Sequence, residues 1–129
     1  MLAEWLQRAS ASIPTLEAQV LAAHVLGVDR SWVIAHPEAG IERDVLDSLL
    51  IRRSAGEPLP YILGWREFYG RRFAVDPRVL IPRQETEILV EMVLENVATG
   101  QKVVDIGTGS GCIALTLAVE RPDLEISAV

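Results

Sequence analysis

Apolar side chains recur three and four positions apart through the first 55 residues, which is the spacing of one face of an α-helix. The pattern falls into three stretches and predicts three long helices. The apolar positions are Leu2, Trp5, Leu6 and Ala9, then Leu16, Val20, Leu21 and Val25, then Val45, Leu46, Leu49 and Leu50. We therefore expect a small helical bundle, near the lower size limit for independent stability.

Proline, serine and glycine mark the expected ends of these helices. Pro14 suits the first turn of the second helix, and Gly27 suits its C-terminal end. Ser31 can cap a short additional helical turn over residues 32–35, and Gly56 closes the third long helix.

Helix breakers and aromatic residues follow the bundle. Residues 57–64 contain two prolines and a glycine and predict a linker. Aromatic residues on either side of a glycine then predict a β-hairpin, with arms at Trp65–Tyr69 and Arg72–Val75 and with Gly70-Arg71 at the turn.

From residue 85 onward the pattern alternates between helical and extended spacing. Glu85–Val97 is amphipathic and predicts a helix. A β-branched strand 103–106 follows, then a helix that runs to about Glu120, then an apolar strand 124–129. The order helix, strand, helix, strand predicts the opening of a parallel sheet, so the fold class is α/β.

The run from Asp105 to Gly111, Asp-Ile-Gly-Thr-Gly-Ser-Gly, is the most informative motif of the chain. Glycines allow turn conformations that other residues rarely adopt, and they let a ligand lie against the main chain. Free amides at the start of the next helix then face that ligand. The run therefore predicts a site for a nucleotide-like ligand.

Two details distinguish between nucleotide cofactors. The dinucleotide fingerprint requires glycine or alanine where this chain has Cys112, which disfavours a nicotinamide-dependent oxidoreductase. Asp105, at the end of a strand, would repel a diphosphate but would tolerate a ligand with cationic groups. S-adenosylmethionine fits better, because it carries an ammonium and a sulfonium group, and we expect Asp105 to contact it.

Composition and charge restrict the remaining functions. The chain has 129 residues, half of them hydrophobic, and a formal net charge of −6, so no basic field favours nucleic acid as a direct ligand. The single cysteine excludes an internal disulfide and fits a reducing compartment. No apolar run approaches the ~18 residues of a membrane span, and no signal peptide precedes the helices. A cytoplasmic protein without membrane contact is expected.

Several residues have a structural interpretation that we favour over a functional one. Two histidines and one cysteine show no metal-ligand spacing, so no metal site is expected. Cys112 is interpreted as a small packing residue, and the three tryptophans as core or domain-interface residues. Glu85 and Glu87 could form an acid/base pair. Their position at the start of a predicted helix instead indicates that they interact favourably with the positive end of the helix dipole.

Further groups of residues make a combination that is more specific than the glycine run alone. They are Gly56-Glu57-Pro58, Tyr61-Ile62-Leu63-Gly64, Glu67-Phe68, Phe73, Val75, Leu80-Ile81-Pro82-Arg83-Gln84-Glu85-Thr86-Glu87 and Asp105 to Ile113. This combination resembles the HemK/PrmC glutamine methyltransferases, which modify peptide chain release factors. The resemblance covers residues 50–129 closely, whereas the N-terminal helices agree in kind only.

The resemblance implies three parts. Residues 1–60 would form a helical substrate-recognition domain, residues 61–76 a linker and β-hairpin, and residues 77–129 the N-terminal part of a Rossmann-like class I methyltransferase domain that binds S-adenosylmethionine. The protein partner would be a peptide chain release factor, which the helical domain helps to recognise.

The resemblance also implies which residues hold the cofactor. Gly107, Thr108, Gly109, Ser110 and Gly111 would wrap the methionine part of S-adenosylmethionine. Arg83, Glu85 and Thr86 are second-rank candidates for lining the same pocket. The family usually has proline at the position of Gln84, so the backbone is less rigid there, with little expected effect on the chemistry.

The implied reaction transfers the sulfonium methyl group to the side-chain amide nitrogen of a glutamine. That nitrogen is a poor nucleophile, so alignment must supply most of the catalysis. Relatives use an Asn-Pro-Pro-Tyr motif for this, and the only asparagine here is Asn96, in a predicted helix. We therefore expect the N-terminal part of such an enzyme, without a catalytic residue and inactive alone. The alternative is an inactive helical module that binds a release factor.

Overall fold

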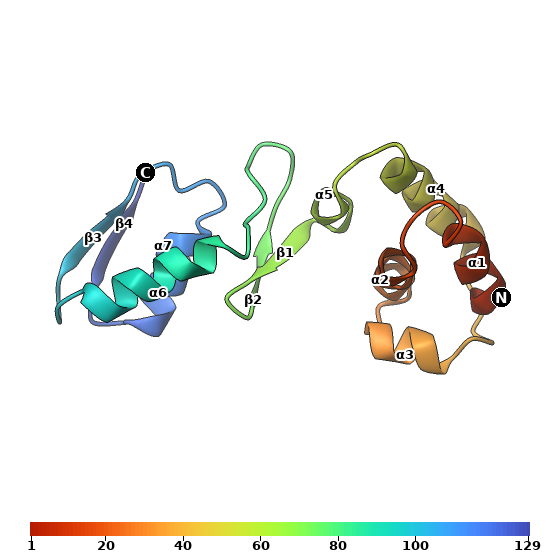
Figure 1. The fold of residues 1–129 in the computed structure, drawn as a ribbon, viewed down its shortest axis with the longest axis horizontal. Helices are drawn as coiled ribbons and strands as arrows, with labels where there is room; N and C mark the ends of the chain where they lie inside the picture. Colours follow the sequence, from red (N-terminus) through yellow and green to blue (C-terminus); the bar gives the residue numbers. More distant parts are fainter. The chain divides into compact units, whose positions relative to one another are not determined.

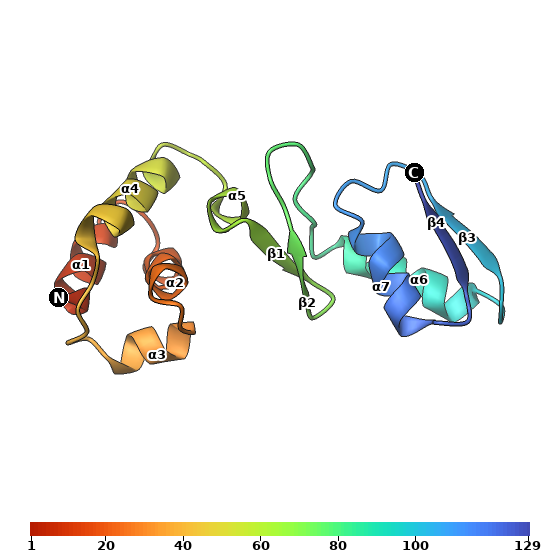
Figure 2. The same ribbon diagram turned by 180° about the vertical axis from the view of Figure 1, so that it is seen from behind.

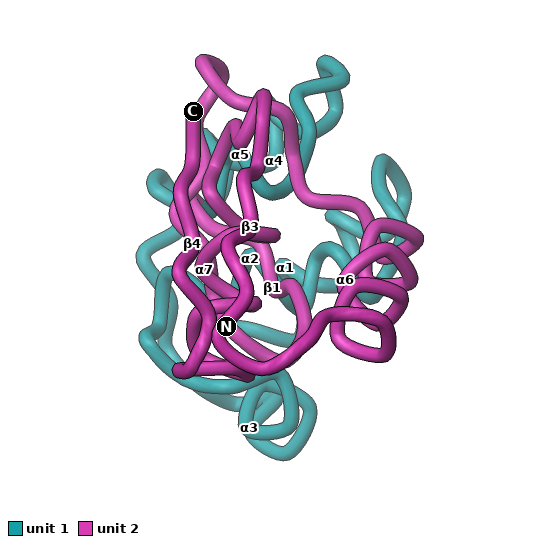
Figure 3. The backbone as a smooth tube through the Cα atoms, turned by 90° about the vertical axis from the view of Figure 1, so that its left-hand side faces the viewer, with its two compact units in different colours: residues 1–63 teal, residues 64–129 magenta.

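Helices alone form the first of the two units into which the chain divides, Met1–Leu63 (Figures 1 and 3). The computed structural model describes all 129 residues. The helices of the first unit are α1 Leu2–Ala9, α2 Thr15–Leu26, α3 Arg30–Ala35, α4 Arg43–Ser54 and α5 Leu59–Leu63. The second unit, Gly64–Val129, contains β1 Trp65–Phe68, β2 Arg71–Ala74, α6 Thr86–Asn96, β3 Lys102–Asp105, α7 Cys112–Glu120 and β4 Glu125–Ala128. None of these helices combines the length and the apolar character needed to cross a membrane.

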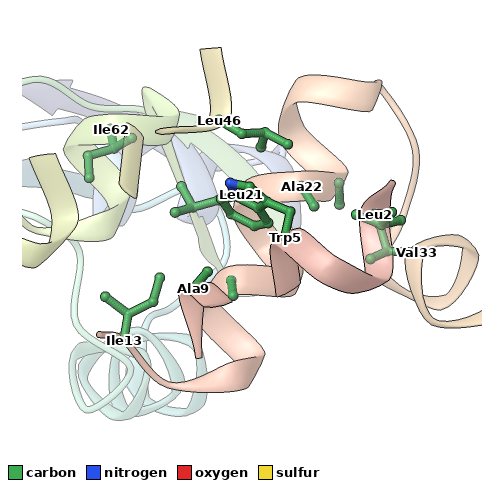
Figure 4. Close-up of a cluster of buried hydrophobic side chains, with 11 residues drawn as sticks. Leu2, Trp5, Ala9, Ile13, Leu21, Ala22, Val33, Leu46 and Ile62 are labelled. Carbon is green, nitrogen blue, oxygen red and sulfur yellow. The ribbon is translucent and has the colours of Figure 1, made fainter. Parts of the chain in front are cut away.

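Helix α2 packs against every other helix of the first unit. The core contains Trp5 of α1, Leu21 of α2 and Leu46 of α4, all fully buried (Figure 4). The indole Nε1–H of Trp5 donates to Asp47 Oδ1 at 2.9 Å, so the polar edge of the buried ring has a partner. The predicted helical bundle is confirmed, and so is the core position of Trp5.

The predicted end of α2 is confirmed, whereas the predicted cap of α3 is not. Gly27 ends α2 in the left-handed conformation, with φ +69°, as predicted. The N-cap of α3 is Asp29, whose carboxylate accepts the Trp32 N–H at 2.8 Å. The prediction that Ser31 caps this helix is wrong, because Ser31 lies inside the first turn and Asp29 has the N-cap spacing to Trp32.

Residues 59–63, predicted to belong to a linker, form the short helix α5. Pro60 does not interrupt it, because it lies in the first turn, where N–H groups have no acceptor within the helix. The Arg52 guanidinium holds the preceding turn through hydrogen bonds of 2.7 and 2.6 Å to the Glu57 carboxylate. Ile62 is buried in the core of the helical unit, and this burial favours the helix.

Strands β1 and β2 form the predicted antiparallel hairpin, but its turn is Tyr69-Gly70 rather than Gly70-Arg71. Phe68 pairs with Arg71, which places Arg71 in the second strand. Tyr69 and Gly70 have φ values of +51° and +76°, which a two-residue type I′ turn requires. The predicted turn was one residue late because a left-handed tyrosine has no sequence signal.

Strands β3 and β4 pair in parallel, with Lys102 opposite Glu125 and Asp105 opposite Ala128. Helix α7 connects them and packs against both strands and against α6 (Figure 2). The helices and the parallel pair predicted for this region are confirmed, with strand and helix ends shifted by one residue.

The hairpin belongs to the second unit because its two phenylalanines pack on the helices of that unit. The Phe68 and Phe73 rings lie edge to face, with centroids 6.1 Å apart. They share a buried cluster with Val90 of α6 and with Cys112 and Leu117 of α7. The interpretation of Cys112 as a packing residue is confirmed.

A hydrogen bond fastens the turn of the hairpin to α6. The Tyr69 N–H donates to Glu87 Oε1 at 2.8 Å. Glu87 lies in the first turn of α6, where the helix dipole also favours a carboxylate. One side chain therefore stabilises both the helix and the strained turn.

Replacing Glu87 with alanine should destabilise the second unit by about 1–3 kcal/mol, because the Tyr69 N–H loses its acceptor. Urea unfolding measures this loss, and amide hydrogen exchange should show reduced protection at Tyr69. Glu95→Ala is the control, because Glu95 is an exposed residue in the last turn of the same helix. Equal stability of the two variants would contradict the role of Glu87.

Candidate cofactor site

Three glycines with positive φ build the turn between β3 and α7. Gly107, Gly109 and Gly111 have φ values of +74°, +57° and +83°. These are conformations that residues with a Cβ rarely adopt. A Cβ added to Gly107 or Gly109 would meet no protein atom within 4 Å. The backbone conformation therefore requires glycine at these two positions, and the space beside the main chain is open to a ligand.

Val129 holds the turn at the carboxyl end of the parallel strands. Its carbonyl oxygen accepts the N–H of Gly107 at 2.9 Å and the N–H of Thr108 at 3.1 Å. Its own N–H donates to the Asp105 carbonyl oxygen at 2.9 Å. The turn thus continues the pairing of β3 with β4. Open α/β sheets bind their ligands outside this end of the strands.

The Asp105 carboxylate is oriented by a residue of the same turn. Thr108 Oγ1 donates to Asp105 Oδ2 at 2.8 Å, and both residues are half-buried. A hydroxyl group that donates to a carboxylate makes a charge-assisted hydrogen bond, which is stronger than one between neutral groups. A carboxylate of fixed orientation therefore lies beside the glycines.

Helix α7 begins without a side-chain cap. Gly111 is its N-cap, and the Leu115 N–H donates to the Gly111 carbonyl oxygen at 2.9 Å. This is the first hydrogen bond of the helix, so the N–H groups of residues 112–114 have no acceptor within it. Together with the helix dipole, they favour a hydrogen-bond acceptor or a negatively charged group at this end.

Two cavities adjoin the turn, and Gly109 and Ser110 line both of them. One has a volume of about 410 Å³ and is otherwise lined by Thr108 and Gly111 and by small and aliphatic residues of α7 and β4. The other has a volume of about 500 Å³ and is otherwise lined by residues 74–76, 78 and 79. Small-molecule sites typically have volumes of ~300–1,000 Å³. The turn therefore has room for a ligand on either side.

Asp76 and Arg78 line the second cavity, although they belong to none of the motifs that point to the cofactor. The Asp76 carboxylate accepts the Arg78 backbone N–H at 2.9 Å, and its Oδ2 accepts Arg78 Nη2 at 2.6 Å. These hydrogen bonds lower the pKa of Asp76 from 3.8 to about 2. The order Asp-Pro-Arg could have indicated the turn, because aspartate often bonds the backbone N–H two residues later.

The second-rank candidates lie away from both cavities. Glu85 is the N-cap residue of α6 and lines a separate hollow of about 300 Å³, together with Gln84, Glu87, Ile88 and Glu91. Thr86 is the first residue of α6, and its N–H donates to the carbonyl oxygen of Arg83 at 3.1 Å. The structure thus brings Asp105 and the glycine turn together, with residues 108–111 lining the cavities and Asp105 and Gly107 lining neither. It places residues 83–86 elsewhere in the same unit.

Comparison with known proteins identifies similar chains. Residues 2–64 match the family model described as the PrmC N-terminal domain. The chain is 46% identical to the release factor glutamine methyltransferase of Nitratidesulfovibrio vulgaris, in an alignment that covers 92% of this chain and 42% of the relative. The corresponding relative from Koribacter versatilis is 46% identical, with 96% and 46% covered. That from Vibrio cholerae is 44% identical, with 98% and 46% covered. The chain spans less than half the length of these curated relatives.

The carboxylate of Asp76 should titrate at about pH 2, as measured by the chemical shift of its carboxyl carbon. Because folding lowers the pKa of Asp76, the ionised carboxylate stabilises the folded state at any pH above the ordinary pKa of 3.8. This contribution disappears as the pH falls towards 2. Arg78→Gln removes the largest cause of the shift, so the titration should move up towards 3.8. Arg83→Gln, at an exposed arginine of the same unit, should leave it unchanged. If Arg78→Gln left the pKa of Asp76 unchanged, the ion pair between Asp76 and Arg78 would not form in solution.

Proposed function

Because the chain belongs to the HemK/PrmC family, we propose that it serves the S-adenosylmethionine-dependent methylation of a glutamine side-chain amide in a peptide chain release factor. The observation that carries the proposal is the glycine turn, which holds a carboxylate and open main chain at the end of two parallel strands. The names of the relatives support the reaction and the protein substrate. A cytoplasmic location is part of the proposal.

The residues of the turn fit S-adenosylmethionine chemically. The Asp105 carboxylate can attract the ammonium group of the methionine part, and its orientation is set by Thr108. The uncapped N–H groups of residues 112–114 can stabilise a negatively charged group such as the carboxylate of the same part. Gly107 and Gly109 leave space for the ligand to approach the backbone. Residues 83, 85 and 86 remain second-rank contacts in this proposal.

The cofactor supplies an electrophilic methyl group bonded to a positively charged sulfur. When bound, it would donate this methyl group to the glutamine amide nitrogen and leave as S-adenosylhomocysteine, with the nitrogen's proton released to water. The contribution of this chain is to bind and orient the cofactor, because proximity and alignment of the reacting groups can account for much of the barrier reduction. None of its residues is assigned to the glutamine amide.

We assign residues 1–60 to recognition of the release factor, residues 61–76 to the connection and residues 77–129 to the cofactor. An alternative function is that of a binding module for a release factor without methyl transfer. One observation favours considering it: residues 1–63 have a hydrophobic core of their own, and the PrmC N-terminal domain model covers this part of the chain. Cofactor binding distinguishes the two functions.

Gly109→Ala should weaken binding of S-adenosylhomocysteine about tenfold or more, because the added Cβ strains a φ of +57° and enters the space beside the main chain. The measurement is calorimetric titration of the polypeptide encoded by the complete reading frame that contains residues 1–129, and of the 129-residue chain itself. Gly100→Ala is the matched control, because Gly100 has a φ of +71° and open surroundings but lies outside the turn. It should lower stability and leave binding unchanged.

Transfer of a labelled methyl group from S-adenosylmethionine to a release factor then tests the reaction. The label should be lost when the target glutamine is replaced by asparagine. Failure of the complete polypeptide to bind S-adenosylhomocysteine would reject the methyltransferase proposal, and retained binding to the release factor would then support the binding module.

A further inference from the structure

We propose that Thr108 is a positioning residue that acts on the cofactor through Asp105, by fixing the carboxylate that recognises the ammonium group of the methionine part. The inference rests on the proposed function and deepens it, because it assigns a separate role to one residue of the turn. It starts from the hydrogen bonds of Thr108, which differ from those of its neighbours.

Every polar group of Thr108 is used inside the protein. Its N–H donates to the Val129 carbonyl oxygen at 3.1 Å, and its carbonyl oxygen accepts the Gly111 N–H at 2.9 Å. Its hydroxyl group donates its only proton to Asp105 Oδ2 at 2.8 Å. Thr108 therefore has no donor left for a ligand, although it lines one of the two cavities. Its contribution to holding a positively charged donor passes through the Asp105 carboxylate.

Gly109 and Ser110 differ from Thr108 in this respect. They line both cavities beside the turn. Their backbone N–H groups take no part in the hydrogen bonds that tie the turn to Val129. Residues of the turn therefore have different roles. Gly109 and Ser110 expose their backbone to the ligand, and Thr108 orients the Asp105 carboxylate.

The hydrogen bond from Thr108 leaves one carboxylate oxygen of Asp105 for recognition. Asp105 ends β3, and its side chain could otherwise rotate between staggered positions. Oδ2 is held by the hydroxyl group three residues later, and Oδ1 accepts no hydrogen bond within the protein, so Oδ1 can accept one from a ligand. A carboxylate of fixed direction favours a ligand with a positively charged donor at one position, and the ammonium group of S-adenosylmethionine is such a donor.

The test compares variants that keep or remove the hydroxyl group. Thr108→Val keeps the shape and the β-branched backbone preference but cannot donate, whereas Thr108→Ser keeps the donor. Calorimetry on the complete polypeptide uses two ligands: S-adenosylhomocysteine, which carries the ammonium group, and 5′-methylthioadenosine, which lacks the amino-acid part. Thr99→Val, at an exposed threonine outside the turn, is the control for the substitution itself.

Thr108→Val should weaken the binding of S-adenosylhomocysteine about tenfold, which is the scale of one well-placed charge-assisted hydrogen bond. It should change the affinity for 5′-methylthioadenosine by less than about twofold. The affinity of Thr108→Ser for each ligand should stay within about threefold of that of the unchanged protein. In an Asp105→Asn background, Thr108→Val should add less than about a further twofold, because the two residues act as one unit.

Equal weakening of both ligands by Thr108→Val would overturn the inference, because it would show that Thr108 only shapes the turn. An unchanged affinity for S-adenosylhomocysteine would overturn it as well. Both results leave the proposed function intact, since the unchanged protein still binds the cofactor analogue. Absence of binding by the unchanged protein would instead reject the proposed function and this inference together. Thermal unfolding of each variant confirms that it is folded, and the serine variant supplies the comparison if the valine variant is not.

Discussion

The candidate site depends on one constraint, the parallel pairing of β3 with β4 and its continuation into the glycine turn. Glycines with positive φ give a turn its shape but not its position. Its position comes from Val129, whose carbonyl oxygen accepts the N–H groups of both Gly107 and Thr108. These two hydrogen bonds place the turn at the end of both strands, and Asp105 and the start of α7 take their places from it.

Local sequence signals predicted the elements that local interactions determine. Gly27 ends α2 as expected, and α6, β3, α7 and β4 lie within one residue of their predicted positions, because hydrophobic spacing and glycine or proline signals act over a few residues. Helix α5 was missed because the burial of Ile62 in a core built by other helices determines it. The turn at Tyr69 was misplaced because the pairing of Phe68 with Arg71 sets the register.

The same distinction applies to the site. The residues from Asp105 to Gly111 are contiguous, so their sequence alone predicted that they lie together. Asp76 and Arg78 are about thirty residues away, and their place beside Gly109 depends on how the hairpin packs. Glu87 was interpreted through the helix dipole alone, and its hydrogen bond to the Tyr69 N–H could not be read from spacing, because the hairpin that carries Tyr69 meets α6 only in the folded unit.

The hairpin is therefore part of the site's framework and more than a connection. Phe68 and Phe73 pack on α6 and α7, which fixes the orientation of β2. The Val75 N–H donates to the Gly64 carbonyl oxygen at 3.0 Å, so the pairing continues one residue beyond the strand. The chain leaves this pair directly into the segment that lines the second cavity. Because packed elements transmit displacements, the hydrophobic cluster under the hairpin helps to position residues 74–76 at that cavity.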